Sequence, residues 1–132
     1  MKVMVSGGFD PPHKGHVRLV KEASQYGEVI VALNSDAWLI AKKGKSFMDW
    51  EERREVLEEW RHVFQVVEVD DSDGTVCEAL RKYHPDYFAN GGDRLYPHPQ
   101  EAEVCRELGI WQLFKVGGDK IQSSSLLCAT HL

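Results

Sequence analysis

The sequence predicts an α/β protein built on a single parallel β-sheet with helices on both faces. Short apolar runs, typical of strands that are buried on both sides, alternate with longer segments whose apolar residues recur at helical spacing. A helix of that length between two strands forms a right-handed crossover, which makes the strands parallel. The 132 residues, of which 42% are hydrophobic, suit one domain with one core, spanning residues 1–132.

The first strand is expected at residues 3–5, where apolar side chains precede a glycine turn at Gly7 and Gly8. Glycine lets the backbone turn sharply and come close to a ligand, because it has no Cβ. A helix is expected to follow from about residue 14 to residue 26. The start of such a helix exposes backbone N–H groups and the positive end of the helix dipole, so this turn is a candidate phosphate site.

Two histidines, His13 and His16, stand three residues apart where this helix begins, with Gly15 between them. At that spacing both imidazoles lie on one helix face and can donate to the same anionic oxygen. The glycine spacing matches neither a P-loop nor the dinucleotide-binding fingerprint. A zinc site or two surface histidines would also explain the pair, but its place inside a glycine-rich turn favours an anion site.

The rest of the chain continues the alternation of strands and helices. Further strands are expected at residues 28–33, 64–69, 87–89 and 110–116, and further helices around residues 38–40, from residue 49 onward, at residues 75–83 and 100–108, and after residue 123. Ser35 or Asp36 is expected to cap the first of these helices, with capping favoured as the role of Asp36, and Asp49 is expected to cap the second. An acidic turn at residues 70–74 lacks the spacing of a calcium-binding loop and is interpreted as a loop and helix cap.

Polar residues follow the second and fourth strands, at residues 34–36 and 90–94. The carboxyl ends of parallel strands form the edge at which open α/β sheets bind ligands. Gly92 would let a ribose or a base approach the backbone, and Asp93 can accept hydrogen bonds from ribose hydroxyls. A simple turn would explain the glycines but not the neighbouring Arg94, so a nucleotide contact is expected there.

Composition restricts the function further. The formal net charge of −5 argues against a general nucleic-acid surface, although the basic loop at residues 42–45 can bind a small anion. No run approaches the ~20 apolar residues of a membrane span, and the N-terminus has no signal-peptide pattern, so a cytoplasmic protein without membrane contact is expected. The three cysteines lie far apart, which indicates reduced thiols rather than metal ligands or disulfides.

The segment Gly8-Phe9-Asp10, followed by His13-Lys14-Gly15-His16, resembles the HxGH signature of the nucleotidyltransferase superfamily. A second segment, Gln122-Ser123-Ser124-Ser125, is similar to the ISSS/T stretch near the C-terminus of that superfamily. The resemblance spans almost the whole chain and extends to the glycerol-3-phosphate cytidylyltransferase and heptose-1-phosphate adenylyltransferase families. It implies a Rossmann-like α/β fold with strand order 3-2-1-4-5 and with every motif on one edge of the sheet.

The resemblance also implies roles for individual residues. The catalytic residues would be His13 and His16 at the α-phosphate, Lys43 and Lys45 at the pyrophosphate, and Ser123. The nucleotide-binding residues would be Gly7, Gly8, Phe9, Asp10, Gly15, Arg53, Arg61, Gly92, Asp93, Arg94 and Ser124. No residue is expected to bind a metal directly. Mg²⁺ is the expected cofactor, held mainly by the phosphates of the nucleotide.

The reaction implied is nucleotidyl transfer from a nucleoside triphosphate to a small phosphorylated polyol or sugar, with release of pyrophosphate. Arg61-His62-Val63 resembles the start of the RYVD segment of cytidylyltransferases and favours CTP. Residues 34–36 and 90–94 resemble adenylyltransferases, so transfer from ATP to a sugar phosphate such as heptose 1-phosphate is the alternative. An inactive nucleotide-binding protein is the alternative of another class. Relatives commonly dimerise, and a homodimer is expected.

Overall fold

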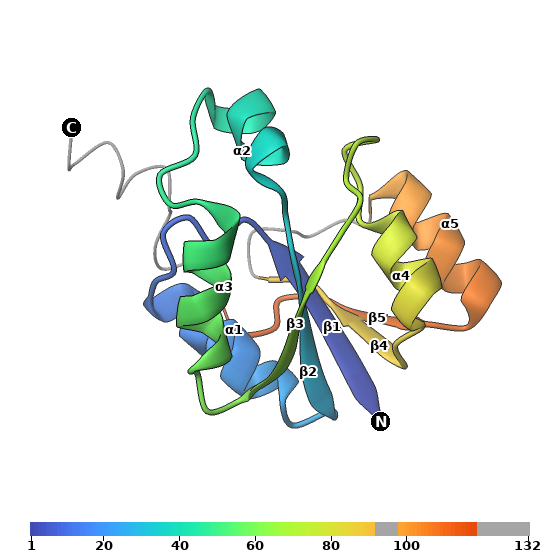
Figure 1. Ribbon diagram of the computed structural model, residues 1–132. Helices are drawn as coiled ribbons and strands as arrows, with labels where there is room; N and C mark the ends of the chain where they lie inside the picture. Colours follow the sequence, from blue (N-terminus) through green and yellow to red (C-terminus); the bar gives the residue numbers. More distant parts are fainter. Residues whose placement is uncertain (92–97, 119–132) are drawn as a thin grey trace.

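The computed structural model describes residues 1–91 and 98–118, which form an alternating series of strands and helices around one parallel sheet (Figure 1). The strands are β1 (Lys2–Gly7), β2 (Glu28–Leu33), β3 (Val63–Glu68), β4 (Tyr87–Ala89) and β5 (Trp111–Leu113). The helices are α1 (Lys14–Ala23), α2 (Asp36–Lys43), α3 (Trp50–Glu58), α4 (Cys77–Tyr83) and α5 (Pro99–Leu108). None of the helices in this part of the chain is long and apolar enough to cross a membrane.

The sheet runs in the order β3-β2-β1-β4-β5, and every pair of neighbouring strands is parallel, which confirms the predicted Rossmann-like α/β fold. The longest pairing runs from Lys2 opposite Glu28 to Gly7 opposite Leu33. The chain passes from β1 to β2 on one side, whereas β4 pairs with β1 on the other side. The carboxyl ends of β1 and β4 are therefore the switch point at which open α/β sheets bind ligands.

The core lies on both faces of the central strands. Helices α1 and α3 cover one face of the sheet, and α4 and α5 cover the other (Figure 1). Val3 and Val5 pack toward α1 and α3, whereas Met4 packs toward α4 and α5, and none of the three has exposed area. Burial on both faces explains why β1 has a continuous apolar run instead of an alternating one.

Two helix boundaries differ from the prediction. Helix α1 ends at Ala23 instead of residue 26, because the N–H groups of residues 25 and 26 bond to carbonyls three residues back and form tighter turns. Helix α4 begins at Cys77 instead of residue 75. Here the N–H and the hydroxyl of Thr75 both donate to the Asp73 carboxylate at 2.8 Å, which closes a local turn before the helix starts.

The last strand and one helix cap also differ from the prediction. Strand β5 ends at Leu113 instead of residue 116, because Lys115 has a left-handed φ of 57° that a strand does not accommodate. Ser35, not Asp36, caps α2, since the Ser35 hydroxyl oxygen accepts the N–H of Trp38 at 3.0 Å. The cap of α3 is confirmed: the Asp49 carboxylate accepts the N–H of Glu52 at 2.8 Å.

One of the cysteines is part of the core. Burial raises the pKa of the Cys105 thiol to about 11. Since the thiolate is the reactive form, we expect iodoacetamide at pH 8 to leave Cys105 unmodified in the folded protein and to modify it after denaturation. Mass spectrometry of the peptides measures both states, and equal modification before and after unfolding would contradict this placement of the side chain.

Candidate active site

The glycine turn and the histidine pair lie together where β1 ends. Phe9 has a left-handed φ of 49° and is buried, as is Asp10 beside it. His13 is the N-cap of α1, and its Nδ1 accepts the N–H of Gly15 at 3.1 Å. The Nδ1 of His16 accepts the N–H of His13 at 3.1 Å. The two rings are stacked with their centroids 3.8 Å apart, so the pair forms one ordered unit at the start of the helix.

These two hydrogen bonds indicate which nitrogen of each imidazole carries the hydrogen. A nitrogen that accepts an N–H uses its lone pair, so in the neutral ring the hydrogen is assigned to Nε2. In His13 and His16 the ring hydrogen is therefore carried on Nε2, beside the positive end of α1, and N–H donors next to a helix N-terminus suit phosphate oxygens. Within residues 1–91 and 98–118, no group of three or more His, Cys, Asp or Glu side chains is arranged to hold a metal ion.

Gly8 allows α2 to pack against the glycine turn. A Cβ at this position would lie 2.7 Å from Leu39 Cδ2 and 3.6 Å from the ring of Trp38. The sequence explained Gly8 by the approach of a ligand, and the structure adds this packing reason. On the same helix, Nζ of Lys42 lies 4.6 Å from the centroid of the Trp38 ring.

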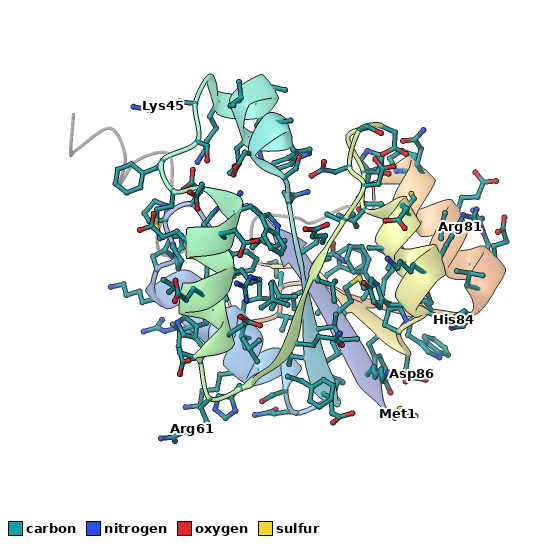
Figure 2. All side chains as sticks on the ribbon, viewed as in Figure 1. Met1, Lys45, Arg61, Arg81, His84 and Asp86 are labelled. Atoms are coloured by element: carbon teal, nitrogen blue, oxygen red, sulfur yellow. The ribbon has the colours of Figure 1, made fainter. Side chains whose placement is uncertain are left out.

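The basic segment begins in the last turn of α2, and its lysines have different surroundings. Lys43 approaches the glycine turn: its Nζ donates to the carbonyl oxygen of Asp10 at 3.0 Å and lies 3.8 Å from the Asp10 carboxylate. Lys45 is exposed and extends outward from the segment between α2 and α3 (Figure 2). The structure thus brings Lys43 to the predicted phosphate turn and leaves Lys45 on the surface.

Arg53 has no exposed area, although the resemblance implied contact with the nucleotide. Its guanidinium donates to four protein oxygens. They are the carbonyls of Gly8 at 2.7 Å, Asn34 at 2.9 Å and Met48 at 3.0 Å, and the carboxylate of Asp36 at 2.6 Å. Arg53 therefore connects the glycine turn to the end of β2 and to the segment before α3, which is a supporting role in place of direct contact.

Asp71 supports the same edge of the sheet and was missed by the sequence analysis. Its buried carboxylate accepts from Nδ2 of Asn34 at 3.0 Å, and from the N–H and hydroxyl of Ser35 at 2.9 and 2.7 Å. These bonds fix the carboxyl end of β2 and the cap of α2. The only signal in the sequence was the acidic turn at residues 70–74, whose composition does not show which carboxylate points inward.

Arg61 lies at the end of the sheet where the strands begin, whereas the histidines lie at the carboxyl ends of the strands. This position corrects the predicted place of Arg61 in the site. It follows α3 and precedes Val63, which pairs with Val29 near the start of β2. Figure 2 shows Arg61 at the same end of the molecule as Met1 and far from Lys45. Within one chain Arg61 does not join the site, so it gives no support to CTP as the donor.

Five of the predicted site residues lie outside the described residues: Gly92, Asp93, Arg94, Ser123 and Ser124. The described chain on either side reaches the expected edge. Asn90 follows β4, donates from Nδ2 to the carbonyl of Leu113 at 3.1 Å and accepts the N–H of Val116 at 3.0 Å. Lys115, an exposed basic residue that the sequence analysis did not single out, stands at the same edge after β5.

The chain after β5 crosses α1 at Gly117, whose N–H donates to the Glu22 carboxylate at 2.8 Å. A Cβ here would lie 2.9 Å from the Leu19 Cα. Gly118 is a matched control for this contact. Its φ of 83° is close to the 85° of Gly117, but no atom in the described part of the chain lies within 4 Å of a Cβ built at Gly118.

We expect Gly117→Ala to lower the free energy of unfolding by about 1–3 kcal/mol more than Gly118→Ala. Urea unfolding measures this, and equal losses would contradict the close contact.

A cleft of about 460 Å³ opens at the same edge, on the side of β2 and β3. The N-terminal residues of α2 and α3 and the end of β3 line it: Ser35, Asp36, Asp49, Trp50, Glu51, Glu68 and Val69. Asp36 links the cleft to the glycine turn through Arg53, which also donates to Gly8. The carboxylates that line the cleft favour ligand groups that donate hydrogen bonds or carry positive charge.

The comparisons with known proteins place this protein among the nucleotidyltransferases. A sequence model described as cytidylyltransferase-like matches residues 4–117, and the chain belongs to the cytidylyltransferase-like family.

The relatives of the chain include proteins with different activities. An FAD synthase of Ferroglobus placidus is 32% identical over 109 residues, which cover 83% of this chain and 70% of that protein. A glycerol-3-phosphate cytidylyltransferase of Staphylococcus aureus is 33% identical over 93 residues, which cover 70% of each chain. The crystal structure of a lipopolysaccharide core biosynthesis protein from Thermoplasma volcanium has the same fold, with a TM-score of 0.74 and 23% identity over 86% of this chain and 93% of that one.

Proposed function

We propose that the protein transfers CMP from CTP to the phosphate of a small polyol or sugar and releases pyrophosphate. The histidine pair carries this proposal, because its Nε2–H donors and the adjoining end of α1 suit a phosphate that gains charge during transfer. The similarity to glycerol-3-phosphate cytidylyltransferases supports CTP as the donor.

In the proposed reaction an oxygen of the acceptor phosphate attacks the α-phosphorus of the triphosphate. As this P–O bond forms, the bond from the α-phosphorus to the bridging oxygen breaks, and its electron pair leaves with pyrophosphate. His13 and His16 stabilise the charge on the α-phosphate and the bridging oxygen by donating from Nε2. Lys43, which lies at the glycine turn, binds the departing pyrophosphate together with Ser123 and Ser124. The residues position the groups and stabilise charge, and no covalent enzyme intermediate is required.

Magnesium is proposed to arrive with the triphosphate. Phosphate oxygens and water would hold the ion, since Mg²⁺ keeps several waters and binds readily to substrate phosphates. When bound, the ion neutralises part of the triphosphate charge. The chain contributes Lys43 and the histidine pair to the same phosphates, so none of these side chains has to coordinate the ion.

The acceptor is proposed to place its carbon chain in the cleft between α2 and α3. The side chains of Asp36, Asp49, Glu51 and Glu68 line this cleft, and carboxylates accept hydrogen bonds from hydroxyls. They would repel a second anionic group on the acceptor. These features favour a phosphorylated polyol or sugar over an acceptor with an additional carboxylate.

A second candidate is adenylyl transfer from ATP. Several relatives of the chain are FAD synthases of archaea, and one of them is 32% identical over 83% of the chain. Arg61, the one residue that separated the two donors in favour of CTP, lies away from the site within one chain.

Calorimetric titration with CTP and with ATP, each with Mg²⁺, decides between these donors. Pyrophosphate release is then measured with glycerol 3-phosphate, a hexose 1-phosphate, 3-phosphoglycerate and flavin mononucleotide. We expect binding of CTP and release with glycerol 3-phosphate. Binding of ATP alone would replace the first candidate with the second. Binding without release for any acceptor would support a nucleotide-binding protein that lacks catalysis.

A further inference from the structure

A buried carboxylate attaches the segment of residues 43–48 to the glycine turn. Asp10 is 1% exposed, and its two oxygens accept the N–H groups of Phe47 and Met48, each at 2.7 Å. Its carbonyl oxygen accepts from Lys43 Nζ at 3.0 Å, and its carboxylate lies 3.8 Å from the same nitrogen. Asp10 thus contacts the segment at both ends, from a position three residues before His13.

Arg53 holds the same segment from the other side. Its Nε donates to the carbonyl of Met48 at 3.0 Å, while one Nη donates to the carbonyl of Gly8 at 2.7 Å. The hydroxyl of Ser46 donates to the Met48 carbonyl as well, at 2.7 Å. The segment is therefore fastened to the glycine turn by directional polar contacts, which tolerate little displacement.

Neither charged group is placed to contact a substrate in this arrangement. Asp10 is 1% exposed and Arg53 is fully buried. The oxygens of Asp10 already accept two amide N–H groups, and four protein oxygens accept from the Arg53 guanidinium. A direct contact with the nucleotide would require breaking charge-assisted bonds in a site without water access, at a large cost.

We propose that Asp10 is a positioning residue: it acts on the reaction by holding Lys43 and the segment of residues 43–48 beside the histidine pair. This inference rests on the proposed role of Lys43 toward pyrophosphate. The ammonium lies at the glycine turn because the carbonyl and the carboxylate of one residue draw it there. The amide bonds to Phe47 and Met48 prevent the segment from moving away. The triphosphate then meets a cation whose position is already set.

A double-mutant cycle tests this dependence. Lys43→Ala should lower kcat/KM for the Mg²⁺-bound nucleotide about 30-fold, the value of one well-placed charged contact. Asp10→Asn should lower it about tenfold in the wild-type background, because an amide accepts only one of the two N–H groups and carries no charge. In the Lys43→Ala background the same change should cost no more than about twofold. The KM for the acceptor should stay the same throughout.

A tenfold loss from Asp10→Asn in both backgrounds would overturn the proposal, since it would show that Asp10 acts independently of Lys43. Failure of the proposed function is a different result, because the wild-type protein would then release no pyrophosphate. Circular dichroism shows whether each variant folds. If Asp10→Asn does not fold, Asp10→Glu replaces it in the cycle, because Glu keeps the charge near Lys43 while changing the geometry of both amide contacts.

Limited proteolysis gives a readout that needs no activity. Trypsin cleaves after Lys43 and Lys45, and attachment of the segment should make both sites slow. We expect Asp10→Asn to increase the rate of cleavage at these two sites at least fivefold. Losing one buried hydrogen bond raises the population of the locally opened segment by roughly that factor, and trypsin cleaves the opened segment. Asp70→Asn is the matched control, because the Asp70 carboxylate is exposed and accepts from Ser72. Unchanged cleavage in Asp10→Asn would contradict the proposed attachment.

Discussion

Replacing His16 with asparagine should lower kcat about a hundredfold and leave the free energy of unfolding nearly unchanged. The loss corresponds to about 3 kcal/mol for one donor to the transition state. In the structure, Nδ1 of His16 accepts the N–H of His13, so the helix needs this atom as an acceptor. The side-chain oxygen of asparagine can accept the same N–H, but asparagine has no donor at the position of Nε2. Single-turnover kinetics and urea unfolding measure the two effects separately.

His16→Ala is the companion variant, because it removes the acceptor and the donor together. It should lose about as much kcat as His16→Asn and also about 1 kcal/mol of stability, the usual contribution of a capping bond. His84→Asn is the control: His84 is exposed, lies at the end of α4 and has a left-handed φ of 45° that asparagine tolerates. A kcat for His16→Asn within twofold of the control would remove His16 from the mechanism.

Replacing Arg53 with methionine should lower the free energy of unfolding by about 3–5 kcal/mol. The methionine fills much of the same volume but leaves the carbonyl oxygens of Gly8 and Asn34 without their donor, while the Met48 carbonyl keeps only the Ser46 hydroxyl. Each buried acceptor that loses its partner costs about 1–3 kcal/mol. Asp36 loses its ion pair as well, although its side chain is 39% exposed and water can solvate it. Equilibrium unfolding in urea, followed by fluorescence, measures the loss.

Arg54→Met is the matched control for this loss. Arg54 is the next residue of α3, and its partners are Glu51 and Glu58 on the exposed side of the same helix. Ion pairs of this kind contribute little, so the urea midpoint of Arg54→Met should stay near that of the wild-type protein. Similar midpoints for the two variants would show that Arg53 is not the connection that its hydrogen bonds indicate.

The fold was predictable because each element has a local signal. Val3, Met4 and Val5 form a continuous apolar run, and such runs mark strands buried on both faces. Crossovers of helical length made the strands parallel, and the family resemblance supplied their order. The bounds were less certain because they depend on single residues. The φ of Lys115 ends β5 early, and nothing in an apolar run indicates that one lysine takes a left-handed conformation.

The histidine pair was predictable because its two residues are close together in the sequence. The residues that support the glycine turn beside it are distant in the sequence. Arg53 donates to Gly8, which lies 45 positions away, and no pattern along the chain links the two. One signal was present: Arg53 lies between Trp50 and Leu57 at spacings of three and four residues, on the buried stripe of α3. The nucleotide contact that the family resemblance implied for Arg61 was wrong for a single chain. Arg61 lies between α3 and β3, where the strands begin, and the histidines lie where the strands end. The homodimer and the cytoplasmic location stay predictions.

The position of Met1 has a practical consequence for measurements on this protein. Met1 is 75% exposed and lies where β1 begins, at the edge of the sheet away from Gly7 and the histidines. A biotin tag or a fluorescent dye added before Met1 would thus be separated from the glycine turn by the full length of β1. Immobilising the protein on a biosensor through this end leaves the proposed nucleotide site facing the solution, so binding of CTP and ATP can be compared on the same surface.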